Sequence, residues 1–204
     1  LLTKRRETRM MQMLNEHAHK NRREAGVMPK IINNLEENIL SAARRLVAEQ
    51  GYAAVTMRAI AKECGIAVGT FYNYYPSKDA MLAACLLHDW QTALASAGER
   101  TAAAQSAEEA VGAVFDAVRA FQEQNRSIFS DEGARSSAAG ALQSRHAQLR
   151  AQIAALLEAP CRRFSDAPDA AFLAEFAAES ILSWSGTDIS FPQLWTLLKR
   201  LFIK

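Results

Sequence analysis

TMRAIAKECGIAVGTFYNY, residues 56–74, is the stretch of sequence that decides the fold. It predicts two short helices joined by a turn at Gly65, because glycine adopts the positive φ of a tight turn without steric cost. Ala61 is small where we expect the second helix to cross the first. The helical spacing directs three apolar residues toward a common core, and these are Ile60, Ile66 and Phe71.

Helical spacing also dominates the rest of the chain, and no alternating strand pattern competes with it. We therefore expect an all-α protein of about nine helices. Asn34 with Glu37 predicts the capped start of a helix that ends at Gly51, and Thr56 caps the next one. Ser77 begins a longer helix that we expect to end near Ala97-Gly98.

Further helices, a loop and a turn complete this helical plan. Ser106 and Glu109 form a capping-box pattern before an amphipathic helix, and residues 130–140 are small and polar, which predicts a loop or a broken helix. The next helix should close at Pro160. A strongly apolar segment that ends at Trp184, a turn at Ser185-Gly186 and a last helix over residues 191–202 follow.

Composition excludes several classes of protein. The longest apolar run has eight residues, 80–87, whereas a membrane-spanning helix needs about 20. No export signal is visible, so we expect a cytoplasmic protein without a membrane partner. The three cysteines are too widely spaced for a disulfide framework or a metal pair, and buried hydrophobes are favoured over redox sensors.

Charge is distributed unevenly along the chain. Residues 1–86 hold 13 Lys and Arg against 8 Asp and Glu, whereas residues 87–204 hold 11 against 14. The N-terminal half therefore suits a polyanionic partner, although solvated charge alone produces such asymmetry in many proteins.

Residues 71–81, FYNYYPSKDAM, extend the opening motif and resemble the DNA-binding head of the TetR/AcrR family of bacterial transcription regulators. The resemblance spans about residues 35–87. It implies a helix-turn-helix head over residues 31–78 and a helical effector-binding and dimerisation body over 79–204. Residues 1–30 are a basic extension in front of this plan.

The resemblance also implies roles for residues of the head. Side chains with hydroxyl or ammonium donors should meet phosphates, and these are Thr56, Thr70, Tyr74 and Lys78. Five residues should approach base edges of duplex DNA in the major groove, and these are Arg58, Val68, Gly69, Tyr72 and Asn73. The alternative is a core position for Tyr72, Tyr74 and Tyr75 and a solvated face for Arg58 and Lys78.

Ala67 and Val68 depart from the family's pattern, which often places a capping Ser or Thr at the first of these positions. Loss of a cap costs about 1 kcal/mol, so we expect a recognition helix that the groove itself partly orders. Arg58 and Asn73 should then carry the polar reading of bases, with Val68 and the Gly69 backbone near thymine methyl groups.

For the body, the resemblance implies a homodimer that packs its last two helices against those of the partner. The candidate interface consists of Phe172, Phe176, Glu179, Ile181, Leu194, Leu197, Leu198 and Leu201. An unknown small-molecule effector would bind among the middle helices, at Trp90, Leu94, Phe115, Phe121, Phe129, His146 and Leu149. Ordinary core packing is the alternative for both sets.

The sequence thus predicts a sequence-specific regulator, a repressor that a small molecule releases from a palindromic operator. The alternatives are a related DNA-bound protein controlled by a protein partner, and activation instead of repression. We expect no enzyme, cofactor or metal site, because no phosphate loop, metal-ligand cluster or nucleophile motif is present. The basic residues 1–30 would contact phosphates or the minor groove, form an extra helix, or fray.

Overall fold

The computed structural model describes residues 34–130 and 145–202 of the 204-residue chain. The expectations for residues 1–30 and most of the polar segment 130–140 lie outside this part. The described residues form nine α-helices and no strand, which confirms the all-α expectation. Within them, no helix combines the length and the apolar character needed to cross a membrane.

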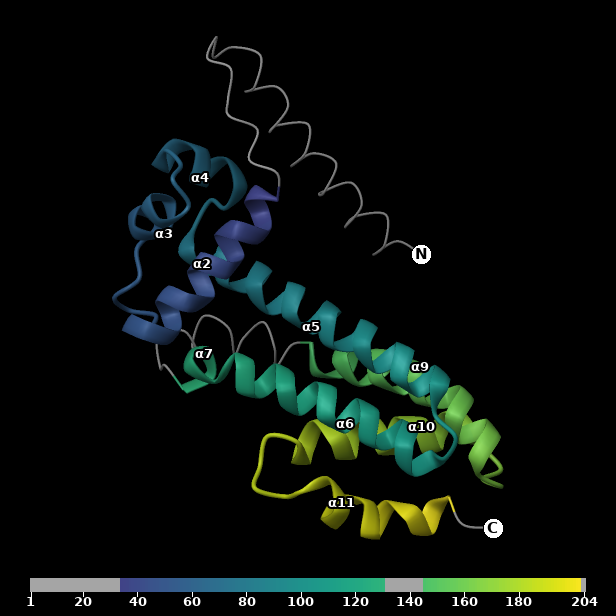
Figure 1. Ribbon diagram of the computed structural model, residues 1–204. Coiled ribbons are helices and arrows are strands. Elements are labelled where there is room, and N and C mark those ends of the chain that lie inside the picture. The colour runs from purple at the N-terminus through teal and green to yellow at the C-terminus, as the bar shows by residue number, and fades with distance from the viewer. Residues whose placement is uncertain (1–33, 131–144, 203–204) are drawn as a thin grey trace.

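Three short or medium helices and the start of a long one form the head (Figure 1). They are α2 (Leu35–Gln50), α3 (Met57–Glu63), α4 (Val68–Tyr74) and the first turns of α5 (Lys78–Ala103). α2 ends as expected at Gly51, whose φ is 78°. Asn34 does not cap its start, because it adopts a left-handed φ of 62° and its side chain accepts no hydrogen bond there.

The predicted caps of the next helices are confirmed. The Ala59 N–H donates to Thr56 Oγ1 at 3.1 Å, and the Ala80 N–H donates to Ser77 Oγ at 3.1 Å. Ser106 likewise accepts from the Glu109 N–H at 3.1 Å. Each hydroxyl satisfies a first-turn N–H that has no partner within its own helix.

Among the described residues, the body consists of the C-terminal part of α5, five further helices and one 3₁₀ turn. After α5 come α6 (Ala107–Gln124), α7 (Arg126–Ser130), α9 (His146–Phe164), α10 (Ala170–Trp184), α11 (Phe191–Leu198) and η1 (Lys199–Leu201). α9 and α10 pack closely together, and α11 lies along α6 at the edge of the body, as Figure 1 shows.

Two predicted helix ends were wrong because tertiary packing continues the helices. α5 runs past Gly98 to Ala103, and a Cβ placed on Gly98 would lie 3.5 Å from Leu156 Cδ2 of α9. The glycine therefore serves a close helix contact rather than a helix end. Pro160 lies buried inside α9, whose packing against α10 outweighs the one backbone hydrogen bond that proline cannot donate.

Head and body meet where α2 packs on α5 and α7. Arg44 Nη2 of α2 lies 2.6 Å from Asp89 Oδ1 of α5, and the Asp89 side chain is only 3% exposed. Buried charges are costly unless they are paired, so this ion pair ties the orientation of α2 to that of α5.

Arg119 of α6 fixes the connection between α10 and α11. Its guanidinium donates to the backbone carbonyl oxygens of Ser185, Thr187 and Ile189 at 3.2, 2.8 and 2.7 Å. It also lies 4.9 Å from the centre of the Phe115 ring. One side chain thus holds the loop that places α11 against α6.

Replacement of Arg119 by methionine should lower the free energy of unfolding by about 1.5–3 kcal/mol, because charged hydrogen bonds to three carbonyl oxygens are lost. Urea denaturation measures this change. Arg162→Met is the matched control: Arg162 forms an exposed pair with Glu158 on α9, for which about 0.5 kcal/mol or less is expected. Equal effects of the two substitutions would contradict the role of Arg119.

Candidate nucleic-acid interface

α3 and α4 form a compact helix pair at the outer end of the head (Figure 1). Gly65 makes the turn between them with a φ of 65°, and the Ile66 N–H donates to the Ala61 carbonyl oxygen at 3.0 Å. Ile60, Ala61 and Phe71 are fully buried between the helices. These positions match the packing roles expected from the sequence.

The residues expected at base edges all lie at the surface of this pair. Arg58, Gly69 and Asn73 are exposed, Tyr72 is 52% exposed, and Val68 is partly buried. A Cβ placed on Gly69 would meet no atom within 4 Å. Packing within the chain therefore does not require glycine there, and its backbone is open to close approach from outside.

The residues expected at phosphates divide into two groups. Thr56, Thr70 and Tyr74 lie at the surface of the head, with Thr56 and Tyr74 exposed and Thr70 partly buried. Lys78 instead turns into the protein. Its Nζ donates to the carbonyl oxygens of Tyr52 at 2.8 Å and Val55 at 3.3 Å. This arrangement differs from the phosphate contact that the resemblance implies.

Tyr75 belongs to the core of the head, which is one of the two alternatives considered for it. It is buried beside Phe71, and its hydroxyl donates to Glu36 Oε1 of α2 at 3.2 Å. Burial, and then the nearby Glu36 carboxylate, raises the pKa of Tyr75 well above its usual value. Tyr75 therefore stays a neutral donor that joins α4 to α2.

α4 lacks a side-chain cap, as the sequence predicted. Ala67 has the extended backbone of an N-cap, with φ −68° and ψ 145°, but offers no oxygen to the first turn. The seven-residue helix therefore starts with fewer satisfied N–H groups than α3 or α5.

Ala67→Ser should stabilise the head, since a serine at this position can accept from a first-turn N–H without a change in backbone. The free energy of unfolding should rise by about 0.5–1 kcal/mol, and amide hydrogen exchange in α4 should slow. Ala67→Gly lacks the oxygen and controls for backbone effects. Faster exchange in α4 of the serine variant would contradict this account of its start.

The predicted effector residues are only partly brought together. Trp90, Phe121 and Phe129 pack edge to face, with ring centres 5.3 and 5.9 Å apart along the row. Leu94 and Leu149 are partly buried against the same core. Trp90 Nε1 donates to Gln152 Oε1 of α9 at 2.8 Å.

Phe115 and His146 do not fit the predicted cavity. Phe115 is fully buried on another side of α6, 5.5 Å from the Phe191 ring of α11. His146 lies at the surface, where its Nε2 is 3.6 Å from Glu179 Oε1. The apolar spacing along a helix does not show which neighbouring helix each side chain contacts. The tertiary arrangement of the helices determines those contacts.

Sequence reasoning missed Asn125, which ends α6 beside the aromatic row. It is 1% exposed, and its Nδ2 donates to the Phe121 carbonyl oxygen at 3.0 Å. Within the described part of the chain, Asn125 Oδ1 is buried without a hydrogen-bond partner. A single polar residue at a helix end carries no sequence signal beyond that of a cap.

Fewer residues of the candidate dimer interface lie at the surface than the sequence predicts. Ile181, Leu194 and Leu198 are buried in the chain's own core, so they do not reach the surface. The apolar side chains that remain exposed on α10, α11 and η1 are Phe172, Phe176, Trp184, Leu197 and Leu201. Trp184 was not predicted, although it ends the apolar segment that the sequence identifies.

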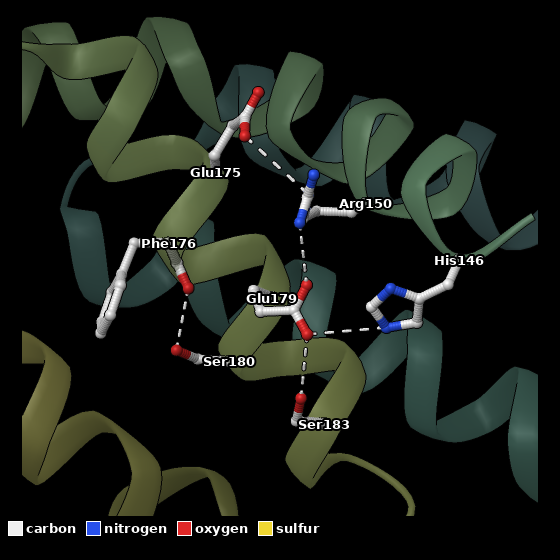
Figure 2. Close-up of polar contacts among 7 residues, drawn as sticks. All are labelled: His146, Arg150, Glu175, Phe176, Glu179, Ser180 and Ser183. Carbon is white, nitrogen blue, oxygen red and sulfur yellow. Dashed lines mark hydrogen bonds and ion pairs between the residues drawn. The ribbon is translucent and has the colours of Figure 1, made fainter.

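Glu179 joins α10 to α9 beside this apolar surface (Figure 2). Its carboxylate lies 3.4 Å from Arg150 Nη1 and 3.6 Å from His146 Nε2, and the Ser183 hydroxyl donates to it. Phe176 projects away from Arg150 and His146. Glu179 therefore belongs to a polar network at the flank of the predicted interface.

The cysteines have the buried character that their spacing suggested. Burial raises the pKa of Cys85 to about 12 and that of Cys161 to about 11. Burial also raises the pKa of the partly buried Cys64. Thiols with raised pKa values hold little reactive thiolate near neutral pH, which weighs against redox sensing. Among the described residues, no group of His, Cys, Asp or Glu is arranged to hold a metal ion.

The family model for "Bacterial regulatory proteins, tetR family" matches residues 39–85, the head and the start of α5. The HTH-type transcriptional regulator UidR of Escherichia coli K12 is 44% identical over 57 residues, which cover 28% of this chain and 29% of UidR. The chain therefore matches less than a third of the length of that curated relative.

Solved structures extend the likeness to the body at the level of the fold. Salmonella enterica GusR matches with a TM-score of 0.56 and 22% identity, covering 85% of this chain and 99% of that one. FadR of Bacillus subtilis, solved in complex with stearoyl-CoA, matches with a TM-score of 0.53 and 16% identity, covering 81% and 97%.

The capped helix α3, linked through Gly65 to α4 with an open outer face, defines a helix-turn-helix DNA-binding domain. Residues 39–85 are therefore similar to the DNA-binding region of TetR-family regulators, and the likeness of the remaining chain to solved structures is one of fold.

Proposed function

We propose that this protein is a transcription repressor that binds a palindromic operator as a homodimer and leaves it when a small-molecule effector binds the body. The exposed outer face of α3 and α4 is the observation that supports the proposed DNA binding. There Arg58, Tyr72 and Asn73 are exposed above a buried core.

In this proposal Arg58 and Asn73 read bases, and Val68, Gly69 and Tyr72 approach the groove floor closely. A bidentate contact of arginine with guanine contributes roughly 1–3 kcal/mol of discrimination. Thr56, Thr70 and Tyr74 would position the head on phosphates, which fixes register without reading sequence.

The exposed apolar side chains of α10, α11 and η1 support dimerisation through these helices. Phe172 is 69% exposed and Leu197 is 71% exposed, and large apolar side chains left exposed in this number favour an interaction surface. Two copies joined there would hold their heads at half-sites about 34–36 Å apart on one face of the duplex.

Phe176→Glu should weaken the dimer at least about tenfold, because a charge would be buried in an apolar interface. Sedimentation equilibrium measures the dissociation constant. Leu87→Glu is the matched control, since Leu87 of α5 and Phe176 are each 47% exposed. A dimer that Leu87→Glu disrupts and Phe176→Glu leaves intact would place the interface on α5 instead.

An effector with an apolar body and one hydrogen-bond donor would suit the aromatic row. Trp90, Phe121 and Phe129 would contact its apolar part, and the unpartnered Asn125 Oδ1 would accept its hydrogen bond. The stearoyl-CoA complex of FadR, a protein of the same fold, supports control by a ligand. Close contact between the three rings favours the alternative, control by a protein partner.

Nuclease footprinting on the DNA that flanks the protein's own gene tests the whole proposal. We expect protection of one inverted repeat, which candidate apolar effectors remove. Protection that no small molecule alters would favour control by a protein partner. Absence of any protected inverted repeat would contradict the autoregulated repressor.

A further inference from the structure

Lys78 is the first residue of α5, and its ammonium group is engaged with the loop between α2 and α3. Nζ donates to the carbonyl oxygens of Tyr52 at 2.8 Å and Val55 at 3.3 Å, and it lies 4.0 Å from the centre of the Tyr52 ring. Both Tyr52 and Val55 are buried residues. An ammonium has three donors, so these contacts occupy most of its bonding capacity.

The neighbouring residue of α5 holds the same loop. The Tyr52 hydroxyl donates to Asp79 Oδ1, so Asp79 holds the hydroxyl of Tyr52 while Lys78 holds its backbone carbonyl oxygen and lies over its ring. The first turn of α5 is itself well anchored, because Ser77 caps it. The loop is thereby attached to the helix that leads into the body.

This loop leads directly into the part of the head proposed to contact DNA. It runs from Gly51 to Thr56, whose hydroxyl caps α3, and Arg58 follows in the first turn of α3. A shift of the loop would move Thr56 and Arg58 relative to α4. If Lys78 instead turned to a phosphate, the Tyr52 and Val55 carbonyl oxygens would lose their donor.

We propose that Lys78 is a positioning residue that holds the α2–α3 loop, and through it Thr56 and Arg58, in register with α4, and that it binds no phosphate. This inference rests on the proposed binding of duplex DNA. It assigns the loss of affinity in a Lys78 variant to misplacement of Arg58 rather than to a missing phosphate contact.

The salt dependence of DNA binding separates the two roles. A lysine that neutralises one phosphate contributes about 0.9 to the slope of log affinity against log salt concentration. For Lys78→Met we expect an unchanged slope and weaker binding to the operator. Preference for the base pair read by Arg58 should fall about fivefold or more, since that is the smaller end of what a bidentate contact discriminates. A slope reduced by about 0.9, with equal weakening on all sequences, would overturn the proposal.

Lys78→Arg provides a variant that keeps the charge and the folded head. A phosphate contact would be retained or strengthened, because arginine binds phosphate well. The planar guanidinium cannot reproduce the two carbonyl contacts of a compact ammonium over the Tyr52 ring. We therefore expect Lys78→Arg to lose the same base preference as Lys78→Met, and wild-type preference in Lys78→Arg would overturn the proposal.

Hydrogen exchange of the whole chain without DNA tests the same role independently of binding. In Lys78→Met the amides of Ala59 and Ile60, which bond to Thr56, should exchange at least about tenfold faster. The amide of Ala110 in α6, which bonds to the Ser106 carbonyl oxygen, should not change. Unchanged exchange at residues 59 and 60 would overturn the proposal. Failure of the wild-type protein to bind any duplex would instead overturn the proposed function, and exchange would still decide the role of Lys78.

Discussion

The structure depends on one continuous helix, α5, which belongs to the head at its first turns and to the body at its last. Its 26 residues span about 39 Å at 1.5 Å per residue. Along this length it holds the α2–α3 loop through Lys78, α2 through Asp89 and α9 through Trp90. Because no break separates these contacts, the orientation of the head follows from the position of α5 in the body.

The Arg44–Asp89 ion pair selects one relative orientation of α2 and α5. Asp89 is a buried carboxylate, and its Oδ2 has no hydrogen-bond partner among the described residues. Apolar packing between α2 and α5 would tolerate a small rotation, but a buried charge separated from its partner is strongly unfavourable. The ion pair therefore favours one arrangement of the two helices, and a displacement of α5 by the body would carry α2 with it.

The sequence was sufficient at most positions where a local rule determines structure, with the predicted cap at Asn34 as an exception. Thr56, Ser77 and Ser106 are caps, and Gly51 and Gly65 have positive φ, because each role depends on a residue and its near neighbours. It was insufficient where a distant helix decides the outcome. Gly98 and Pro160 lie inside helices, Phe115 faces α11, and Ile181 lies in the core instead of at the surface. The role of Lys78 has the same origin, since residues 23 and 26 positions earlier receive its hydrogen bonds.

Selection from a library of random duplex DNA tests most directly whether the head reads sequence as this account requires. The account predicts enrichment of an inverted repeat with a guanine under Arg58 and thymines beneath α4, lost in part when Arg58 is replaced by alanine. Recovery of sequences without a shared motif, or of a motif that Arg58→Ala leaves unchanged, would contradict it.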